Sequence, residues 1–119
     1  MRYEVLSGGS CIGWSELEFG DPPMGVAHGR FHPSDFYRSA LHAGPEADLR
    51  ARPEGSDEFF QPSAGVFIED LSAEFGPEGI EVSVLGLDAQ VYRRFFSHHV
   101  QSYENQFRSG LPSQVDRQY

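Results

Sequence analysis

The fold is decided by residues 66–85, which read VFIEDLSAEFGPEGIEVSVL. Two segments with alternating apolar residues, 66–75 and 80–85, flank the sequence GPEG at residues 76–79. Glycine and proline favour a chain reversal, and a four-residue connection suits an antiparallel β-hairpin. Period-two spacing turns one side of each strand toward a core and the other toward water. We therefore expect two buried faces, formed by Phe67, Leu71, Ala73 and Phe75 on the first strand and by Ile80, Val82 and Val84 on the second.

The N-terminal residues predict a second hairpin. Tyr3 and Val5 alternate with polar residues, the pair Gly8-Gly9 interrupts the pattern, and the alternation resumes at Ile12. Glycine adopts positive φ without steric cost, so a glycine pair between two such segments indicates a turn. After a proline-rich loop at residues 20–25, residues 26–31 read as a further short strand.

Two helices are expected. The sequence PSD at residues 33–35 suits the start of a helix that ends before Gly44-Pro45. Asp88 is expected to cap a C-terminal helix that continues to about Phe107, with apolar residues at i, i+3 and i+4 spacing. The resulting prediction is a single α+β domain over residues 1–107, followed by a mobile tail over residues 108–119. Its antiparallel sheet is built from hairpins, with the C-terminal helix packed on one face and the shorter helix near an edge.

Length and composition set the class of protein. A chain of 119 residues suits one domain, and a hydrophobic content of 39% with 13% aromatic residues is too apolar for a disordered chain. Cys11 is the single cysteine, so no disulfide forms within the chain. We see no signal peptide and no run approaching the roughly 20 apolar residues of a membrane span. We therefore expect a cytoplasmic protein that does not enter membranes.

The negative charge is concentrated in one segment. Residues 53–92 contain nine Asp and Glu and no Arg, while the rest of the chain has nine of each sign, so the segment accounts for the whole net charge of −9. This charge disfavours nucleic acid as a partner. The acidic surface is interpreted either as a solvated face or as a docking surface for a basic protein. The carboxylates expected to bind that partner belong to Asp70, Glu74, Glu78 and Glu81.

A ligand pocket between the sheet and the helix is the alternative, lined by His28, Arg30 and Glu69. Glu69 shares the predicted buried face with Phe67, where a carboxylate needs a bonding partner. A small hydrolase or ligand-binding protein would follow from such a pocket. However, the sequence contains no nucleophile elbow, P-loop or dinucleotide fingerprint, and its histidines match no metal-binding spacing. We therefore predict no catalytic residue, no metal and no cofactor.

Two segments also carry a resemblance. Residues 20–27 and 68–74, which read GDPPMGVA and IEDLSAE, resemble small bacterial hypothetical proteins without an established activity. In size, acidity and simplicity, the chain is similar to immunity proteins that neutralise bacterial toxins. This resemblance implies an acidic protein-binding or regulatory module and assigns no catalytic residue. The third hypothesis is a self-associating subunit that forms a homodimer.

Overall fold

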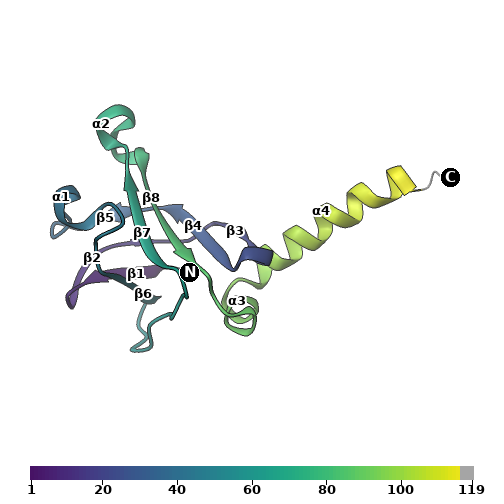
Figure 1. The fold of residues 1–119 in the computed structure, drawn as a ribbon, viewed down its shortest axis with the longest axis horizontal. Coiled ribbons are helices and arrows are strands. Elements are labelled where there is room, and N and C mark those ends of the chain that lie inside the picture. Colours follow the sequence, from purple (N-terminus) through teal and green to yellow (C-terminus); the bar gives the residue numbers. More distant parts are fainter. Residues whose placement is uncertain (116–119) are drawn as a thin grey trace.

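The structure, a computed structural model, describes the backbone of residues 1–115 and the side chains of residues 1–107. It has the predicted α+β class, but the strands are divided between two four-stranded antiparallel sheets, ordered β5-β2-β1-β6 and β3-β4-β8-β7 (Figure 1). The strands are β1 (Tyr3–Ser7), β2 (Ser10–Ser15), β3 (Phe19–Asp21), β4 (Val26–Arg30), β5 (His32–Pro33), β6 (Leu49–Pro53), β7 (Gly65–Asp70) and β8 (Ile80–Leu85). The α-helices are α1 (Ser39–His42), α2 (Ser72–Phe75), α3 (Ala89–Phe95) and α4 (Ser97–Val115), and the 3₁₀ helices are η1 (Pro22–Met24) and η2 (Gly76–Gly79).

The first hairpin is confirmed. β1 and β2 pair antiparallel and are joined by Gly8 and Gly9, whose φ angles of 57° and 87° are both positive. That backbone conformation matches the twist of the strands and is one that glycine adopts readily. β6 pairs with the other side of β1, and β5 pairs with β2.

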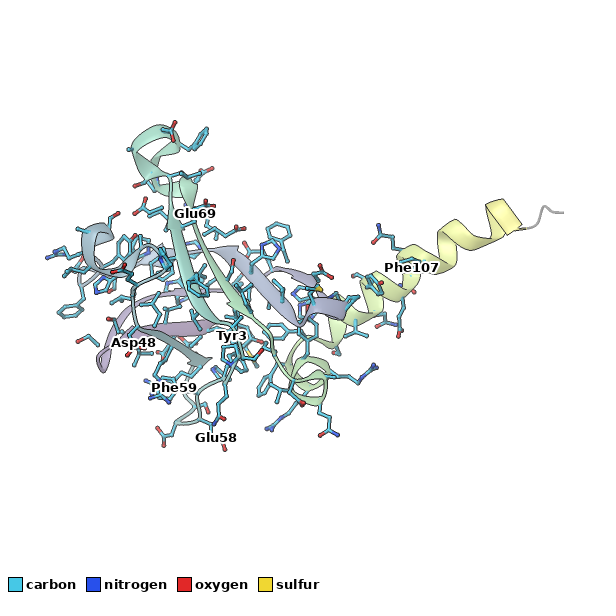
Figure 2. All side chains as sticks on the ribbon, viewed as in Figure 1. Tyr3, Asp48, Glu58, Phe59, Glu69 and Phe107 are labelled. Atoms are coloured by element: carbon cyan, nitrogen blue, oxygen red, sulfur yellow. The ribbon has the colours of Figure 1, made fainter. Side chains whose placement is uncertain are left out.

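The second hairpin is confirmed in position, but it differs in length and in the face that it buries. β7 ends at Asp70, and residues 71–79 form α2 and η2. Val66 and Ile68 are the buried side chains of β7, paired with Val84 and Val82 of β8. The buried face predicted for Phe67, Leu71, Ala73 and Phe75 is therefore wrong. Glu69 lies on the outer face of β7 (Figure 2), Phe67 shares that face by the alternation of the strand, and the other three residues follow the end of the strand.

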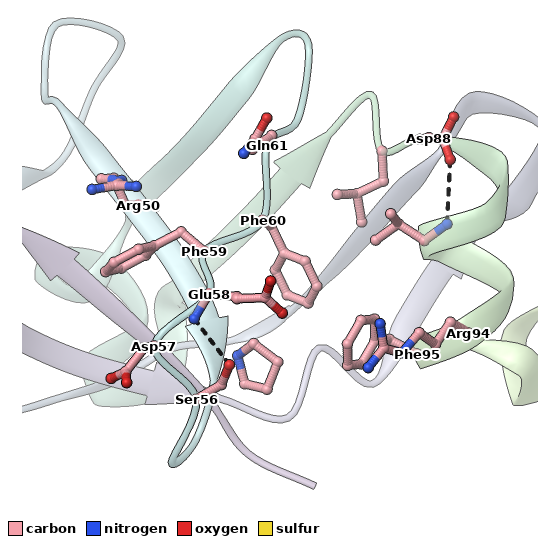
Figure 3. Close-up of a pocket in the computed structure, with 13 residues that line it drawn as sticks. Arg50, Ser56, Asp57, Glu58, Phe59, Phe60, Gln61, Asp88, Arg94 and Phe95 are labelled. Atoms are coloured by element: carbon pink, nitrogen blue, oxygen red, sulfur yellow. Dashed lines mark hydrogen bonds between the residues drawn. The ribbon is translucent and has the colours of Figure 1, made fainter.

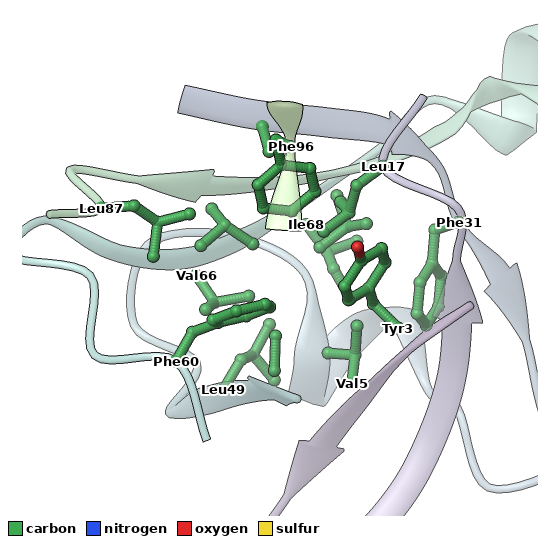
Figure 4. Packing of buried hydrophobic residues seen from close by; sticks show 14 of the residues in the cluster. Tyr3, Val5, Leu17, Phe31, Leu49, Phe60, Val66, Ile68, Leu87 and Phe96 are labelled. Carbon is green, nitrogen blue, oxygen red and sulfur yellow. The ribbon is translucent and has the colours of Figure 1, made fainter. Parts of the chain in front are cut away.

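The hydrophobic core lies between the two sheets (Figure 4), and residues of α3 and of the start of α4 close it at one end. Tyr3 from β1, Phe60 from the segment after β6, and Phe96 between the two helices place their ring centroids 5.3–6.1 Å apart. Phe96 has no exposed surface, and burying each such ring contributes about 2–3 kcal/mol. One continuous cluster thus joins both sheets and both C-terminal helices into a compact domain.

The predicted C-terminal helix is divided in two. Asp88 caps α3 as expected, accepting hydrogen bonds from the backbone N–H groups of Gln90 and Val91 at 3.0 and 3.4 Å. The helix is interrupted at Phe96, whose φ and ψ of −125° and 39° turn the chain. Two side chains attach the helices to strand β4 and to the segment between β2 and β3. The Tyr92 hydroxyl donates to the carbonyl of Val26, and His99 Nε2 donates to the carbonyl of Leu17, both at 2.8 Å.

Helix α4 projects away from the body after its first turns (Figure 1). It continues to Val115, eight residues past the predicted end, so the absence of apolar periodicity after Phe107 did not mark a helix end. The mobility expected for residues 108–119 is not tested, since residues 116–119 lie outside the described part of the chain. Within that part, no helix has both the length and the apolar composition required to span a membrane.

The helix predicted after residue 33 is mostly absent. Only α1, residues Ser39–His42, is helical, because His32 and Pro33 pair with Trp14 and Gly13 of β2 as strand β5. The chain between β5 and β6 therefore runs mostly as turns and passes beside β7, where the Gly44 N–H donates to the Ile68 carbonyl at 3.0 Å. The short helix does lie near a sheet edge, as expected.

Candidate binding surfaces

The hairpin tip, residues 71–79, is the first candidate surface. It stands beyond Asp70 and Ile80, the last paired residues of β7 and β8 (Figure 1). The Leu71 N–H donates to the Gly79 carbonyl at 2.9 Å and closes the tip. Phe75 is 68% exposed and Leu71 is 40% exposed, while Glu74 and Glu78 are also exposed. The tip thus combines apolar and acidic side chains in one projecting element.

Asp70, predicted together with Glu74 and Glu78 to bind a basic partner, does not belong to this exposed set. Its side chain is half-buried, accepting a hydrogen bond from the Tyr37 hydroxyl at 2.6 Å and another from the Ser72 N–H at 2.9 Å. Burial raises the pKa of Asp70, but hydrogen bonds from Ser72, Tyr37 and Ser39 outweigh burial and lower the pKa to about 2. Asp70 is therefore ionised at neutral pH and fixes the base of the tip to the segment before α1.

A second group of charges lies on the outer face of the second sheet. Strand register places Arg30, Glu81 and Glu69 side by side on β4, β8 and β7. His28 Nδ1 contacts Glu81 Oε2 at 2.9 Å. The structure thus brings together the three residues predicted for a ligand pocket, His28, Arg30 and Glu69. It places them on the open outer face, so a pocket between sheet and helix lined by these three residues is wrong.

The sequence placed Glu69 on a buried face, where its carboxylate would need a bonding partner, but the structure places it elsewhere. Because β7 buries Val66 and Ile68, the face carrying Phe67 and Glu69 is the solvent side, and Glu69 is exposed. Glu69 lies directly opposite Glu81, however, and like charges in that position repel each other. A shallow depression of about 500 Å³ lies beside these two carboxylates and is bounded by residues 43–45.

A third candidate was not found from the sequence. A groove of about 680 Å³, which we call the α3 groove, lies between residues 53–61 and helix α3 (Figure 3). Its walls carry Phe59, Phe60 and Phe95 together with charged side chains of both signs. In the sequence, the adjacent apolar residues Phe59 and Phe60 within a polar loop indicate only that this loop is anchored. The partner wall follows some 30 residues later, and no local pattern connects the two.

The histidine and cysteine side chains have structural contacts. His42 and His99 are buried, and His42 Nδ1 accepts a hydrogen bond from the Arg38 N–H at 2.9 Å. The Cys11 thiol lies 3.4 Å from the Gly13 carbonyl. Over the described side chains, no three His, Cys, Asp or Glu residues are grouped so that they could hold a metal ion.

Comparisons with protein-family models, with curated proteins and with solved structures find no match to this chain.

Proposed function

We propose that this protein is a binding module that docks onto a basic surface of another protein through its hairpin tip. Phe75 carries the proposal, since its ring is 68% exposed on an element that projects past the paired strands. Leu71 adds further apolar surface at the base of the tip. Aromatic side chains that lose contact with water at the centre of an interface commonly supply much of its binding energy.

The tip is preorganised for this role. Its backbone is closed by the bond from Leu71 to Gly79, and the Phe75 N–H donates to the Leu71 carbonyl at 3.0 Å. Asp70 holds the base of the tip through Tyr37 and Ser72. A surface that already has its binding conformation loses less conformational entropy when a partner arrives.

The charge around Phe75 indicates the chemistry of the partner. Glu74 and Glu78 are exposed on the same tip, and no Arg or Lys occurs in residues 53–92. Carboxylates at the rim of an interface mainly increase the association rate and the specificity for a basic partner. The expected partner surface is an apolar recess surrounded by Lys or Arg, and the mechanism is occlusion of that surface, as an immunity-like protein would act.

The test compares two residues of matched exposure. Wild type, Phe75→Ser and Met24→Ser are immobilised and exposed to lysate of the source cells, and each basic protein retained by wild type is then purified and titrated against all three. Met24 is 66% exposed but lies in η1, away from the tip. Asp70 is left unchanged because it has a structural role.

We expect Phe75→Ser to weaken binding of the purified partner by about tenfold or more, while Met24→Ser leaves it unchanged. Glu74→Arg combined with Glu78→Arg should slow association, and raising salt from about 50 mM to about 500 mM should slow it in wild type. Two outcomes contradict the proposal: wild type retains no basic protein, or the Phe75 and Met24 variants titrate identically.

A further inference from the structure

The α3 groove has the size and the apolar floor of a small-molecule site. Phe60 and Leu87 form its base and are 8% and 7% exposed, so the groove reaches the hydrophobic core. Phe95 of α3 lies on one wall and the segment before Phe60 on the other (Figure 3), and Val91 of α3 also lines the groove. Its volume of about 680 Å³ falls in the range found for small-ligand pockets.

Two arginine side chains border this floor, and each lies over an aromatic ring. The Arg50 guanidinium is 3.8 Å from the centroid of the Phe59 ring, and the Arg94 guanidinium is 4.9 Å from that of Phe95. Among residues 1–107, neither guanidinium takes part in an ion pair with a carboxylate. A guanidinium held by its face against a ring keeps the N–H groups along its edge available for a carboxylate.

The groove is also lined by two carboxylates without a partner among residues 1–107, those of Asp57 and Glu58, and the Asp57 carboxylate points away from Phe60 in Figure 3. Glu58 lies beside Phe60 in Figure 3, and among residues 1–107 its side chain takes part in no ion pair or hydrogen bond. Its backbone is fixed, since the Glu58 N–H donates to Ser56 Oγ at 3.0 Å. Asp88 differs from Glu58 because it accepts the N–H groups that begin α3.

From this arrangement we propose that the α3 groove binds a small zwitterion with an apolar side chain, namely a free apolar α-amino acid. The carboxylate of the ligand is bound by Arg94 and its ammonium group by Glu58, while its side chain lies over Phe60 and Phe95. A ligand with only a negative charge would be repelled by Glu58, and one with only a positive charge would be repelled by Arg94 and Arg50. Only a ligand that carries both charges can pair with the guanidinium of Arg94 and with the carboxylate of Glu58.

This proposal is independent of protein docking, because the groove shares no residue with the hairpin tip. The full chain is titrated with L-phenylalanine and L-leucine while the backbone amide resonances of residues 56–61 and 88–95 are followed by NMR. Three further probes each lack one feature. They are 3-phenylpropanoate, which has no ammonium group, 2-phenylethylamine, which has no carboxylate, and glycine, which has no apolar side chain.

We expect saturable shifts with both apolar amino acids, and affinities about tenfold or more lower for each of the three deficient probes. Glu58→Gln should remove the preference for L-phenylalanine over 3-phenylpropanoate, and Arg94→Gln should remove its preference over 2-phenylethylamine. Arg93→Gln is the matched control, since Arg93 is exposed on the same helix but does not line the groove.

Three results would overturn the proposal. In the first, millimolar L-phenylalanine and L-leucine produce no saturable shift in these segments. In the second, 3-phenylpropanoate or 2-phenylethylamine binds as tightly as the amino acid of the same size, which indicates a site for a single charge. In the third, Arg93→Gln lowers affinity as much as Arg94→Gln, which indicates an effect of net charge on the helix.

Discussion

The two hairpins of this protein are closed in different ways. β1 and β2 are joined by two glycines alone, and a Cβ added at either one would meet no atom within 4 Å. β7 and β8 are joined by nine residues that form two short helices and expose Phe75 and Leu71. A hairpin needs only two residues to reverse, so the longer connection is not required for pairing the strands.

The difference shows which apolar residues belong to the core. On β7, Ile68 is 2% exposed and faces Val82, whereas Phe75 is 68% exposed although it is the larger side chain. Apolar character alone therefore does not mark a buried position in this hairpin. The paired strands β7 and β8, which form the stem of the hairpin, stabilise the fold, and the tip exposes apolar surface to solvent.

The sharpest test of this contrast substitutes one residue in each part. Ile68→Ala removes a core side chain from the stem and is expected to lower the free energy of unfolding by about 2–4 kcal/mol. Phe75→Ala should change it by no more than about 0.5 kcal/mol, because the ring has little contact to lose. Urea unfolding followed by far-UV circular dichroism measures both values. A loss above about 1.5 kcal/mol in Phe75→Ala would show that the tip is part of the core.

Much of the fold could be predicted because its signals are local. The glycine pair at residues 8–9, the alternation at residues 80–85 and the cap at Asp88 all depend on neighbours in the sequence. Which face of β7 is buried could not be predicted from the sequence, because both faces of the strand carry apolar residues. The packing of β7 against β8 and the rest of the core determines which face is buried. Pro33 was likewise assigned to a helix because its strand partner, Gly13, lies 20 residues away.

The candidate sites divide in the same way. The acidic segment could be recognised from the sequence, because residues 53–92 contain many carboxylates and no Arg. The structure leaves Glu74 and Glu78 exposed within it. That Asp70 bonds Tyr37 could not be foreseen, because the two residues meet only after the chain folds. The α3 groove has walls from two segments separated by the whole β7–β8 hairpin, so no spacing rule identifies it.

A smaller effect is expected where the stem meets the tip. Asp70→Asn removes the ionised acceptor of the Tyr37 hydroxyl and should destabilise the protein by about 1–2 kcal/mol at pH 7. The folded-state pKa of Asp70 is lowered from 3.8 to about 2, so its contribution is complete above pH 3.8 and is lost as the pH falls toward 2. The difference in unfolding free energy between wild type and variant should therefore shrink over that interval.

Urea titrations at several pH values from 7 down to about 2 would measure this difference. Tyr37→Phe serves as the companion variant, since it removes the donor of the same hydrogen bond while keeping the Asp70 carboxylate. It should destabilise the protein by about 1 kcal/mol. A difference between wild type and Asp70→Asn that stays constant down to pH 2 would show that the carboxylate does not stabilise the base of the tip.

The smallest effect is expected on the outer face of the stem, where Glu69 lies opposite Glu81. Glu69→Gln removes this repulsion and should stabilise the protein by about 0.2–0.5 kcal/mol at low ionic strength, with less gain as salt is added. Glu81→Gln removes the same repulsion but also weakens the 2.9 Å contact with His28 and the attraction of Arg30, so it should gain less or lose stability. Urea midpoints of the two variants, compared at low and high salt, separate these effects. If both substitutions raise the midpoint equally, the contact between His28 and Glu81 contributes nothing measurable to the free energy of unfolding. The carboxylates on the outer face of β7 and β8 are then not stabilised by pairing with His28 or Arg30.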